Sequence, residues 1–230
     1  MVADALEAGL RVVGVTGGVG AGKSHVARAL ATVLPASLID ADAIVQDLLK
    51  MPQVLADIEV AVGFSIRDSD GTLNRDTLGQ RVFADQAARR ALEGVLHPAV
   101  RRRIWEDLEA LEAAGGPAWA LLDVPLLHEV GLDKVCDLLV HVDAPLELRR
   151  ARACARHGWD AATWEAREAA QLPEEEKQRR ADAILDNDAE AEDLSRRIEA
   201  LIPRLRDLPP RPLRARWPAW DAEPKRHPSS

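Results

Sequence analysis

Residues 17–24 (GGVGAGKS) have the types and spacing of a loop that binds phosphate groups, G-x-x-x-x-G-K-[ST]. The glycines Gly17, Gly20 and Gly22 allow backbone N–H groups to turn toward phosphate oxygens, and Ala21 adds a small side chain among them. Lys23 offers a mobile positive charge to the β- and γ-phosphates. Ser24 offers a hydroxyl to Mg²⁺, a metal that prefers oxygen ligands. The predicted chemistry is the binding of ATP with Mg²⁺.

The surroundings of this loop support the interpretation. An apolar, β-branched run at residues 10–16 predicts a buried strand before the loop, and a helical pattern at residues 23–34 follows it. A glycine-rich turn with a chance lysine would lack this context. A dinucleotide-binding fingerprint is a poorer fit, because it needs glycine where Lys23 stands.

Acidic residues follow two of the predicted strands. Asp40 and Asp42 end the run IDAD, and their spacing places them on one side of an extended segment. Asp42 is therefore a candidate general base for an acceptor hydroxyl, although a helix N-cap is an alternative and compatible role. Asp123 ends the apolar run LLDV, where it either lies near Mg²⁺ or is a structural strand-end carboxylate.

Arginines supply candidate cations for a transferring phosphoryl group. Arg149, Arg152 and Arg156 have the spacing i, i+3, i+7 and share one face of a predicted helix. A solvated helix face is the alternative. Only five of the 30 basic residues are lysines, and Lys23 is the one to which the sequence assigns chemistry.

The elements around these residues predict an α/β fold in three layers, α/β/α, with a parallel sheet. The predicted strands cover residues 10–16, 37–40, 119–124 and 138–142, and the helical patterns lie at 23–34, about 85–96, about 98–114 and about 145–156. Residues 43–96 are expected to form an inserted helical lobe. Residues 150–180 are expected to form mobile surface helices, and residues 206–230 a Pro/Arg-rich tail that is extended or disordered.

Composition narrows the class of protein. The 230 residues are 47% hydrophobic with a net charge of −8, which excludes a disordered chain and disfavours a nucleic-acid partner. No signal peptide and no membrane-spanning run is visible, so a soluble cytoplasmic protein with small-molecule partners is expected. The sequence does not indicate an oligomeric state.

Several classes of protein share such a phosphate loop. A GTPase normally carries N-K-x-D, yet none of the five lysines follows an asparagine. Residues 68–71 match the GTPase pattern D-x-x-G but are more simply a turn. A small kinase fits better, because it needs a carboxylate at the acceptor, cations over the phosphoryl group and a cover against water. A nucleoside or nucleoside-monophosphate kinase and a non-catalytic ATP-binding regulator are the alternatives.

The order of motifs resembles that of the dephospho-CoA kinase family over about residues 10–205. The matching stretches are TGGVGAGKS (16–24), IDAD (39–42), DGTLNRDTL (70–78) with VF (82–83), LHP (96–98), VPLLHE (124–129), R-x-x-x-R (Arg152, Arg156), Gln171, EEK (175–177) and AD-x-I-x-x-N (181–187). The resemblance implies phosphorylation of the ribose 3′-hydroxyl of dephospho-CoA by ATP, the final step of coenzyme A synthesis.

The resemblance also implies residue roles. Asp42 would be the base, and Lys23 and the loop would hold the ATP phosphates. Residues 150–180 would form a helical lid from which Arg152 and Arg156 reach the phosphates, and the lobe of residues 43–96 would bind the acceptor. Asn187 would lie near the adenine. Pro125, Leu126 and Leu127 would line the acceptor pocket with His97 nearby, and His97 has packing or a helix start before Pro98 as its alternative.

Two positions depart from the family pattern. His25 stands where threonine is usual, and its backbone N–H remains able to bind phosphate. His128 stands where phenylalanine is common, which leaves the shape of the acceptor pocket open. Beyond the resemblance, Trp217 and Trp220 in the tail offer a partner site, with a disordered extension as the alternative.

Overall fold

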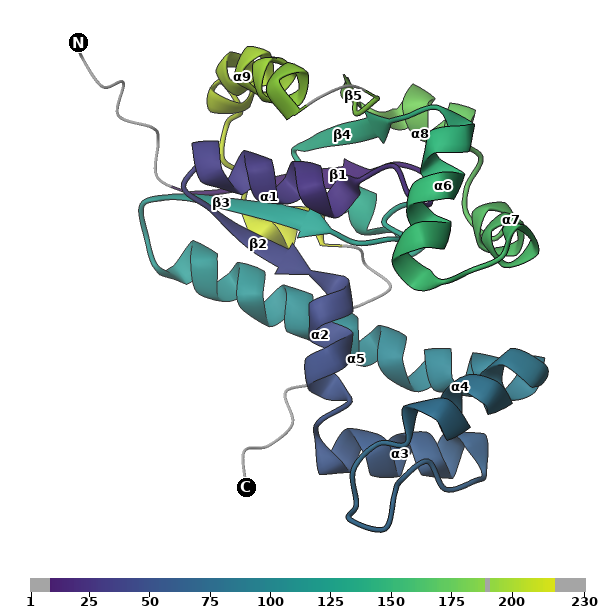
Figure 1. Cartoon of the computed structure of the whole chain (residues 1–230). Helices are drawn as coiled ribbons and strands as arrows, with labels where there is room; N and C mark the ends of the chain where they lie inside the picture. Colours follow the sequence, from purple (N-terminus) through teal and green to yellow (C-terminus); the bar gives the residue numbers. More distant parts are fainter. Residues whose placement is uncertain (1–8, 189–190, 218–230) are drawn as a thin grey trace. The chain divides into compact units, whose positions relative to one another are not determined.

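The computed structural model describes residues 9–188 and 191–217 (Figure 1). They divide into two compact units, one of residues 9–40 and 108–217 and one of residues 41–107. The expected lobe of residues 43–96 falls inside the second unit. None of the helices in the described ranges is long and apolar enough to cross a membrane.

The first unit is built on a five-stranded parallel sheet in the order β2-β3-β1-β4-β5. The strands are β1 (Gly9–Thr16), β2 (Ala36–Asp40), β3 (Pro117–Asp123), β4 (Leu138–Asp143) and β5 (Ala183–Asp186). Asp123 pairs in register with Asp40 on one side and Val15 on the other. The carboxyl ends of these neighbouring strands therefore meet at one edge, where ligands bind in open α/β sheets.

The four strands predicted from apolar runs are all present, and β5 is an addition. β5 is only four residues long, and Ile184 within it is 55% exposed. A short edge strand with an exposed face lacks the continuous apolar run that marks a buried parallel strand.

Two helices cover one face of the sheet. α1 (Lys23–Val33) contributes Val26 and Leu30, and α9 (Ala191–Arg206) contributes Ile198, to one buried cluster with strand residues such as Val13. Neighbouring strand residues point to the opposite face. There a Cβ on Gly14 would come within 2.8 Å of Leu127 and closer still to Cys136, so only glycine fits.

The remaining elements of this unit surround the sheet. They are η1 (Leu132–Val135), α6 (Leu146–His157), α7 (Ala161–Ala169), α8 (Glu174–Arg180) and α10 (Leu213–Arg216). The predicted α/β layers are thereby confirmed. α1 and α9 cover one face of the sheet (Figure 1), and Leu127 and Cys136, on either side of η1, pack against the other.

The second unit is helical: α2 (Ala41–Leu48), α3 (Pro52–Val62), α4 (Arg75–Ala84) and most of α5 (Gln86–Ala113). Its core is a separate apolar cluster that contains Leu55, Ile58, Ile66, Leu78 and Leu96. The D-x-x-G stretch is a turn as predicted, because Gly71 N donates to Asp68 O at 2.9 Å and Gly71 has a φ of +85°.

One helix replaces two expected ones. The predicted break at His97-Pro98 is wrong, because α5 continues through Pro98 for 28 residues. Proline removes one helical hydrogen bond and strains the preceding turn, but flanking turns on both sides can retain the helix. His97 consequently lies inside a helix, half-buried, and does not begin one.

The first part of the C-terminal tail is packed, which corrects the expectation of an extended or disordered tail from residue 206. Leu213 is fully buried, and Arg211 and Arg216 both pair with the carboxylate of Asp137. Asp137 also accepts a hydrogen bond from Val12 N at 2.7 Å, so the tail is joined to β1. Trp220 and the rest of the tail after Trp217 lie outside the described residues.

We expect Arg216→Ala to reduce the free energy of unfolding by about 1–3 kcal/mol, because it removes the buried one of the two arginines that pair with the Asp137 carboxylate and leaves Arg211 in place. Arg214→Ala is the matched control. The Arg214 side chain is 68% exposed and lies 3.7 Å from Glu109, a contact expected to contribute less than about 1 kcal/mol. Urea unfolding of the three proteins measures both values, and equal losses would contradict this account of the tail.

Candidate nucleotide site

The phosphate loop joins β1 to α1, and its shape depends on close packing around Gly22. Gly22 caps α1 with a φ of +94°. A Cβ at this position would collide with the side-chain amide of Asn187, which donates to Ala21 O at 2.7 Å. Asn187 itself is held by Arg152, whose guanidinium donates to Asn187 O at 2.8 Å. The last turn of the loop is thus fixed by Asn187, just after β5.

Lys23 lies along the loop. Its Nζ donates to Gly17 O at 3.0 Å and to Gly18 O at 2.9 Å. Burial lowers the pKa of Lys23, and the carboxylate of Asp123 is the strongest of the charges that oppose this shift. Asp123 is 4% exposed at the end of β3. The predicted cation and the predicted metal-side carboxylate therefore act on each other in the structure.

A cavity of about 370 Å³ opens beside the loop. It is lined by Gly20, Gly22, His25, Arg152, Ala153, Arg156, His157, Asn187 and Leu194. The structure thus brings together six residues predicted to bind ATP. Sequence reasoning missed Ala153, His157 and Leu194, although the first two lie at the i+1 positions of the predicted arginines Arg152 and Arg156 in α6.

The three arginines predicted on one helix face divide into two roles. Arg152 and Arg156 line the cavity. Arg149 is 4% exposed, donates to Ala144 O at 3.1 Å and pairs with Glu168 of α7. Its guanidinium also lies 5.8 Å from the ring centroid of Trp164, so Arg149 is part of a packed contact between α6 and α7.

The lid helices are attached to the loop, whereas the sequence suggested mobile surface helices. Gly18 N donates to Glu174 Oε1 at 3.1 Å, and Val19 N donates to Glu168 Oε2 at 2.9 Å. Trp164, which is 3% exposed, donates from Nε1 to Val19 O at 3.2 Å. Two carboxylates and one indole therefore form hydrogen bonds with the backbone of Gly18 and Val19, the tip of the loop.

Glu174 lies among cations and a histidine from β4. Its Oε1 is 3.0 Å from Nε2 of the fully buried His141, and its Oε2 is 3.6 Å from Nζ of Lys177. Lys177 is 2% exposed and also donates to Gln171 Oε1 at 2.7 Å. Sequence analysis assigned no role to Lys177, and the structure makes it a second buried lysine with defined contacts in the site.

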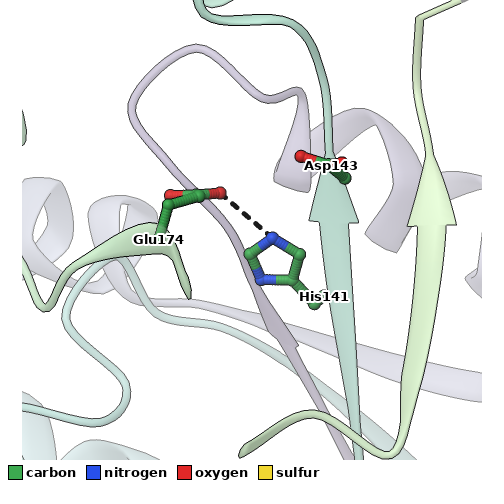
Figure 2. A group of neighbouring side chains, drawn as sticks. All are labelled: His141, Asp143 and Glu174. Carbon is green, nitrogen blue, oxygen red and sulfur yellow. Dashed lines mark ion pairs between the residues drawn. The ribbon is translucent and has the colours of Figure 1, made fainter. Parts of the chain in front are cut away.

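Figure 2 shows Glu174 facing His141, with Asp143 at the end of the same strand. These three side chains offer ligand atoms within 4.8 Å of one another, which is close enough for a metal ion. Lys177 beside Glu174, however, already provides positive charge. We therefore interpret the group as an ion-paired support of the loop.

The ionisation of Glu174 should make the stability of the fold depend on pH. Burial alone would raise its pKa, but the hydrogen bond from His141 and the charges of Lys177 and Arg149 lower the pKa of Glu174 to about 2. A lowered folded-state pKa stabilises the fold above the ordinary value of 4.5, and this stabilisation is lost as pH falls toward 2. Chemical unfolding of the wild type and Glu174→Gln should show a stability difference at pH 6 that shrinks at about pH 3. A difference that is constant with pH would contradict the ion-paired state.

The acceptor-side segment follows β3 in the same unit. Pro125 and Leu126 are half-buried. Leu127 is 1% exposed and packs against the position of Gly14, so its side chain is part of the buried core in this structure. His128 is 8% exposed with Nδ1 3.5 Å from Asp133, so the residue that departs from the family pattern lies beside a carboxylate.

Asp42 and His97 belong to the second unit. Asp42 is exposed and is the second residue of α2, inside the first turn, so it does not occupy the N-cap position. A carboxylate in a first turn is favoured by the helix dipole. Asp42 follows Asp40, the last residue of β2, by two positions.

A parallel sheet with a G-x-x-x-x-G-K-S loop between β1 and α1 defines a P-loop nucleotide-binding protein, and the carboxylates and arginines near it are typical of small kinases. Residues 11–193 match the family model described as dephospho-CoA kinase. The chain belongs to the dephospho-CoA kinase family.

Individual relatives support the same family assignment. The chain is 42% identical over 198 residues to the dephospho-CoA kinase of Anaeromyxobacter dehalogenans, which covers 86% of this chain and 93% of that protein. It is 43% identical over 195 residues to that of Deinococcus radiodurans, with 85% and 92% covered. Among solved structures, the dephospho-CoA kinase from Campylobacter jejuni superimposes with a TM-score of 0.64 at 26% identity, with 85% and 97% covered.

Proposed function

We propose that this chain transfers the γ-phosphoryl group of ATP to the ribose 3′-hydroxyl of dephospho-CoA, giving coenzyme A and ADP in the cytoplasm. Family membership supports the choice of acceptor. The observation that carries the ATP side is the cavity beside the phosphate loop, where Arg152, Arg156 and Asn187 surround the end of the loop. A cationic cavity continuous with a phosphate loop suits a nucleoside triphosphate.

The loop and its neighbours have separable roles in this proposal. The N–H groups of Gly20, Gly22, Lys23 and Ser24 would face the phosphates, and that of His25 would share its bond to Gly22 O with them. Lys23 would leave its two carbonyl partners to contact the β- and γ-phosphates. Ser24 and Asp123 provide the hard oxygen ligands that suit Mg²⁺, which would neutralise phosphate charge when bound. Arg152 and Arg156 would contact the phosphates as the lid closes over them.

Asp42 has the central role in the proposed reaction of the acceptor. Its carboxylate would accept the proton of the 3′-hydroxyl as the oxygen bonds to the γ-phosphorus and the bond to the ADP oxygen breaks. Pro125, Leu126 and His97 would bound the acceptor, and Leu127 supports this segment from the core. Both carboxylate and hydroxyl need to be shielded from water during transfer.

A direct assay tests this proposal. Purified protein with ATP and Mg²⁺ is offered dephospho-CoA, AMP or adenosine, and ADP formation is recorded by a coupled enzyme reaction. We expect turnover with dephospho-CoA, loss of turnover on chelation of Mg²⁺, and a new 3′-phosphomonoester signal in the ³¹P NMR spectrum. Turnover with AMP or adenosine in place of dephospho-CoA would overturn it.

A further inference from the structure

The tip of the phosphate loop is held by two acidic side chains from the lid helices. Glu168 of α7 accepts a hydrogen bond from Val19 N, and Glu174 of α8 accepts one from Gly18 N. Acidic side chains so near a site for a polyanion are unexpected on charge alone. Either nearby cations neutralise these carboxylates, or the carboxylates compete with phosphate for the loop.

Each carboxylate has its own cation. Arg149 pairs with Glu168 and is itself 4% exposed, while Lys177, 2% exposed, lies 3.6 Å from Glu174. His141 adds a third partner to Glu174 at 3.0 Å. The low pKa of Glu174 keeps it ionised at neutral pH. The negative charges are thus offset locally, and incoming phosphate would meet little net repulsion from them.

The carboxylates bind a part of the loop that does not line the cavity. Gly20, Gly22 and His25 line it, whereas Gly18 and Val19 are absent from its lining. The indole of Trp164 also donates to Val19 O, so both backbone polar groups of Val19 form hydrogen bonds with α7. A side chain at Gly18 would collide with the Arg149 guanidinium, which shows how closely this contact packs.

We propose that Glu168 and Glu174 are positioning residues, which fix the tip of the phosphate loop from the lid side so that the rest of the loop is preformed for a triphosphate. A glycine-rich loop has much backbone entropy to lose when it orders around a ligand. Bonds at Gly18 and Val19 remove part of that loss before ATP arrives, which favours binding. The same bonds couple the placement of α7 and α8 to the shape of the loop.

The test compares removal, conservative replacement and matched controls. Glu168→Ala and Glu174→Ala remove the acceptor, and Glu168→Gln and Glu174→Gln keep an acceptor oxygen without its charge. Glu165→Ala and Glu175→Ala, on exposed positions of the same helices, are the controls. Isothermal titration calorimetry with MgATP, without acceptor, gives Kd, and steady-state assays give KM for ATP and for dephospho-CoA.

We expect each alanine variant to raise the Kd and the KM for MgATP about tenfold, because it removes a hydrogen bond to a charged acceptor. The KM for dephospho-CoA should change less than about twofold, and the glutamine variants should recover most of the affinity because their amide oxygens still accept from the loop. The control variants should match the wild type.

Two results would overturn the inference. Tighter MgATP binding in the alanine variants would show that the carboxylates compete with phosphate. A lower thermal midpoint with unchanged Kd and KM would show a role in stability alone. The inference relies on the proposed function only for ATP binding at this loop. A wild type that binds MgATP without using dephospho-CoA would refute the proposed acceptor and leave the calorimetric test intact.

Discussion

Replacing Lys23 by methionine is expected to lower kcat/KM by about 10²–10³-fold, the usual effect of removing one preorganised donor to a transferring group. Lys23 is the cation closest to the loop carbonyls, with Nζ bonded to Gly17 O and Gly18 O. Methionine retains the length of the side chain and removes its charge. The loss should appear in kcat as well as KM, because the Lys23 charge stabilises negative charge that develops on the phosphate oxygens during transfer.

The same substitution should leave the fold intact. Burial lowers the pKa of Lys23, so the cost of burying its charge offsets part of what its two hydrogen bonds contribute to stability. Removing the charge together with these bonds is therefore expected to change the free energy of unfolding by no more than about 1 kcal/mol. Urea unfolding checks this, and Lys50→Met is the control, because Lys50 is 70% exposed and pairs only locally with Asp47. Full activity in Lys23→Met would exclude Lys23 from the phosphate site.

The parts of the fold that sequence predicts well are those with a local signal. The loop and its flanking strand and helix combine glycine spacing, an apolar run and helical periodicity within residues 10–34, and all three features are present. The buried strands β1, β3 and β4 follow from apolar runs for the same reason, whereas β2 is an edge strand in which only Ile39 is buried. Pro98 misled the helix prediction, because a proline signal is local while the packing that keeps α5 continuous is not.

The features that the sequence did not reveal depend on contacts between distant residues. Asp137 and Arg216 form a buried ion pair across 79 positions, and no local pattern distinguishes Arg216 from the other tail arginines. Glu168 and Glu174 lie in a stretch rich in charge that resembles a solvated surface, yet both contact loop residues about 150 positions earlier. The buried Trp164 is a nearby signal that this stretch packs against another part of the chain.

Replacing Asp42 by asparagine is expected to lower kcat by about 10²–10⁴-fold, the range that a positioned general base contributes. Asparagine keeps the size of the side chain and a hydrogen-bond acceptor but cannot take the proton of the 3′-hydroxyl. The Kd for MgATP should stay within about twofold of the wild-type value, because the proposed role of Asp42 concerns the acceptor hydroxyl. Calorimetry and single-turnover kinetics separate the two quantities.

Asp47→Asn is the matched control, since Asp47 lies in the same helix α2, is exposed and pairs with Lys50 at 2.7 Å. The pH profile distinguishes a base from a hydrogen-bond acceptor. The wild type should lose kcat as acid protonates the Asp42 carboxylate, whereas Asp42→Asn should lack that acidic limb. If Asp42→Asn keeps the wild-type kcat and acidic limb, the base lies elsewhere, and Asp40, half-buried at the end of β2 and in register with Asp123, becomes the carboxylate to test.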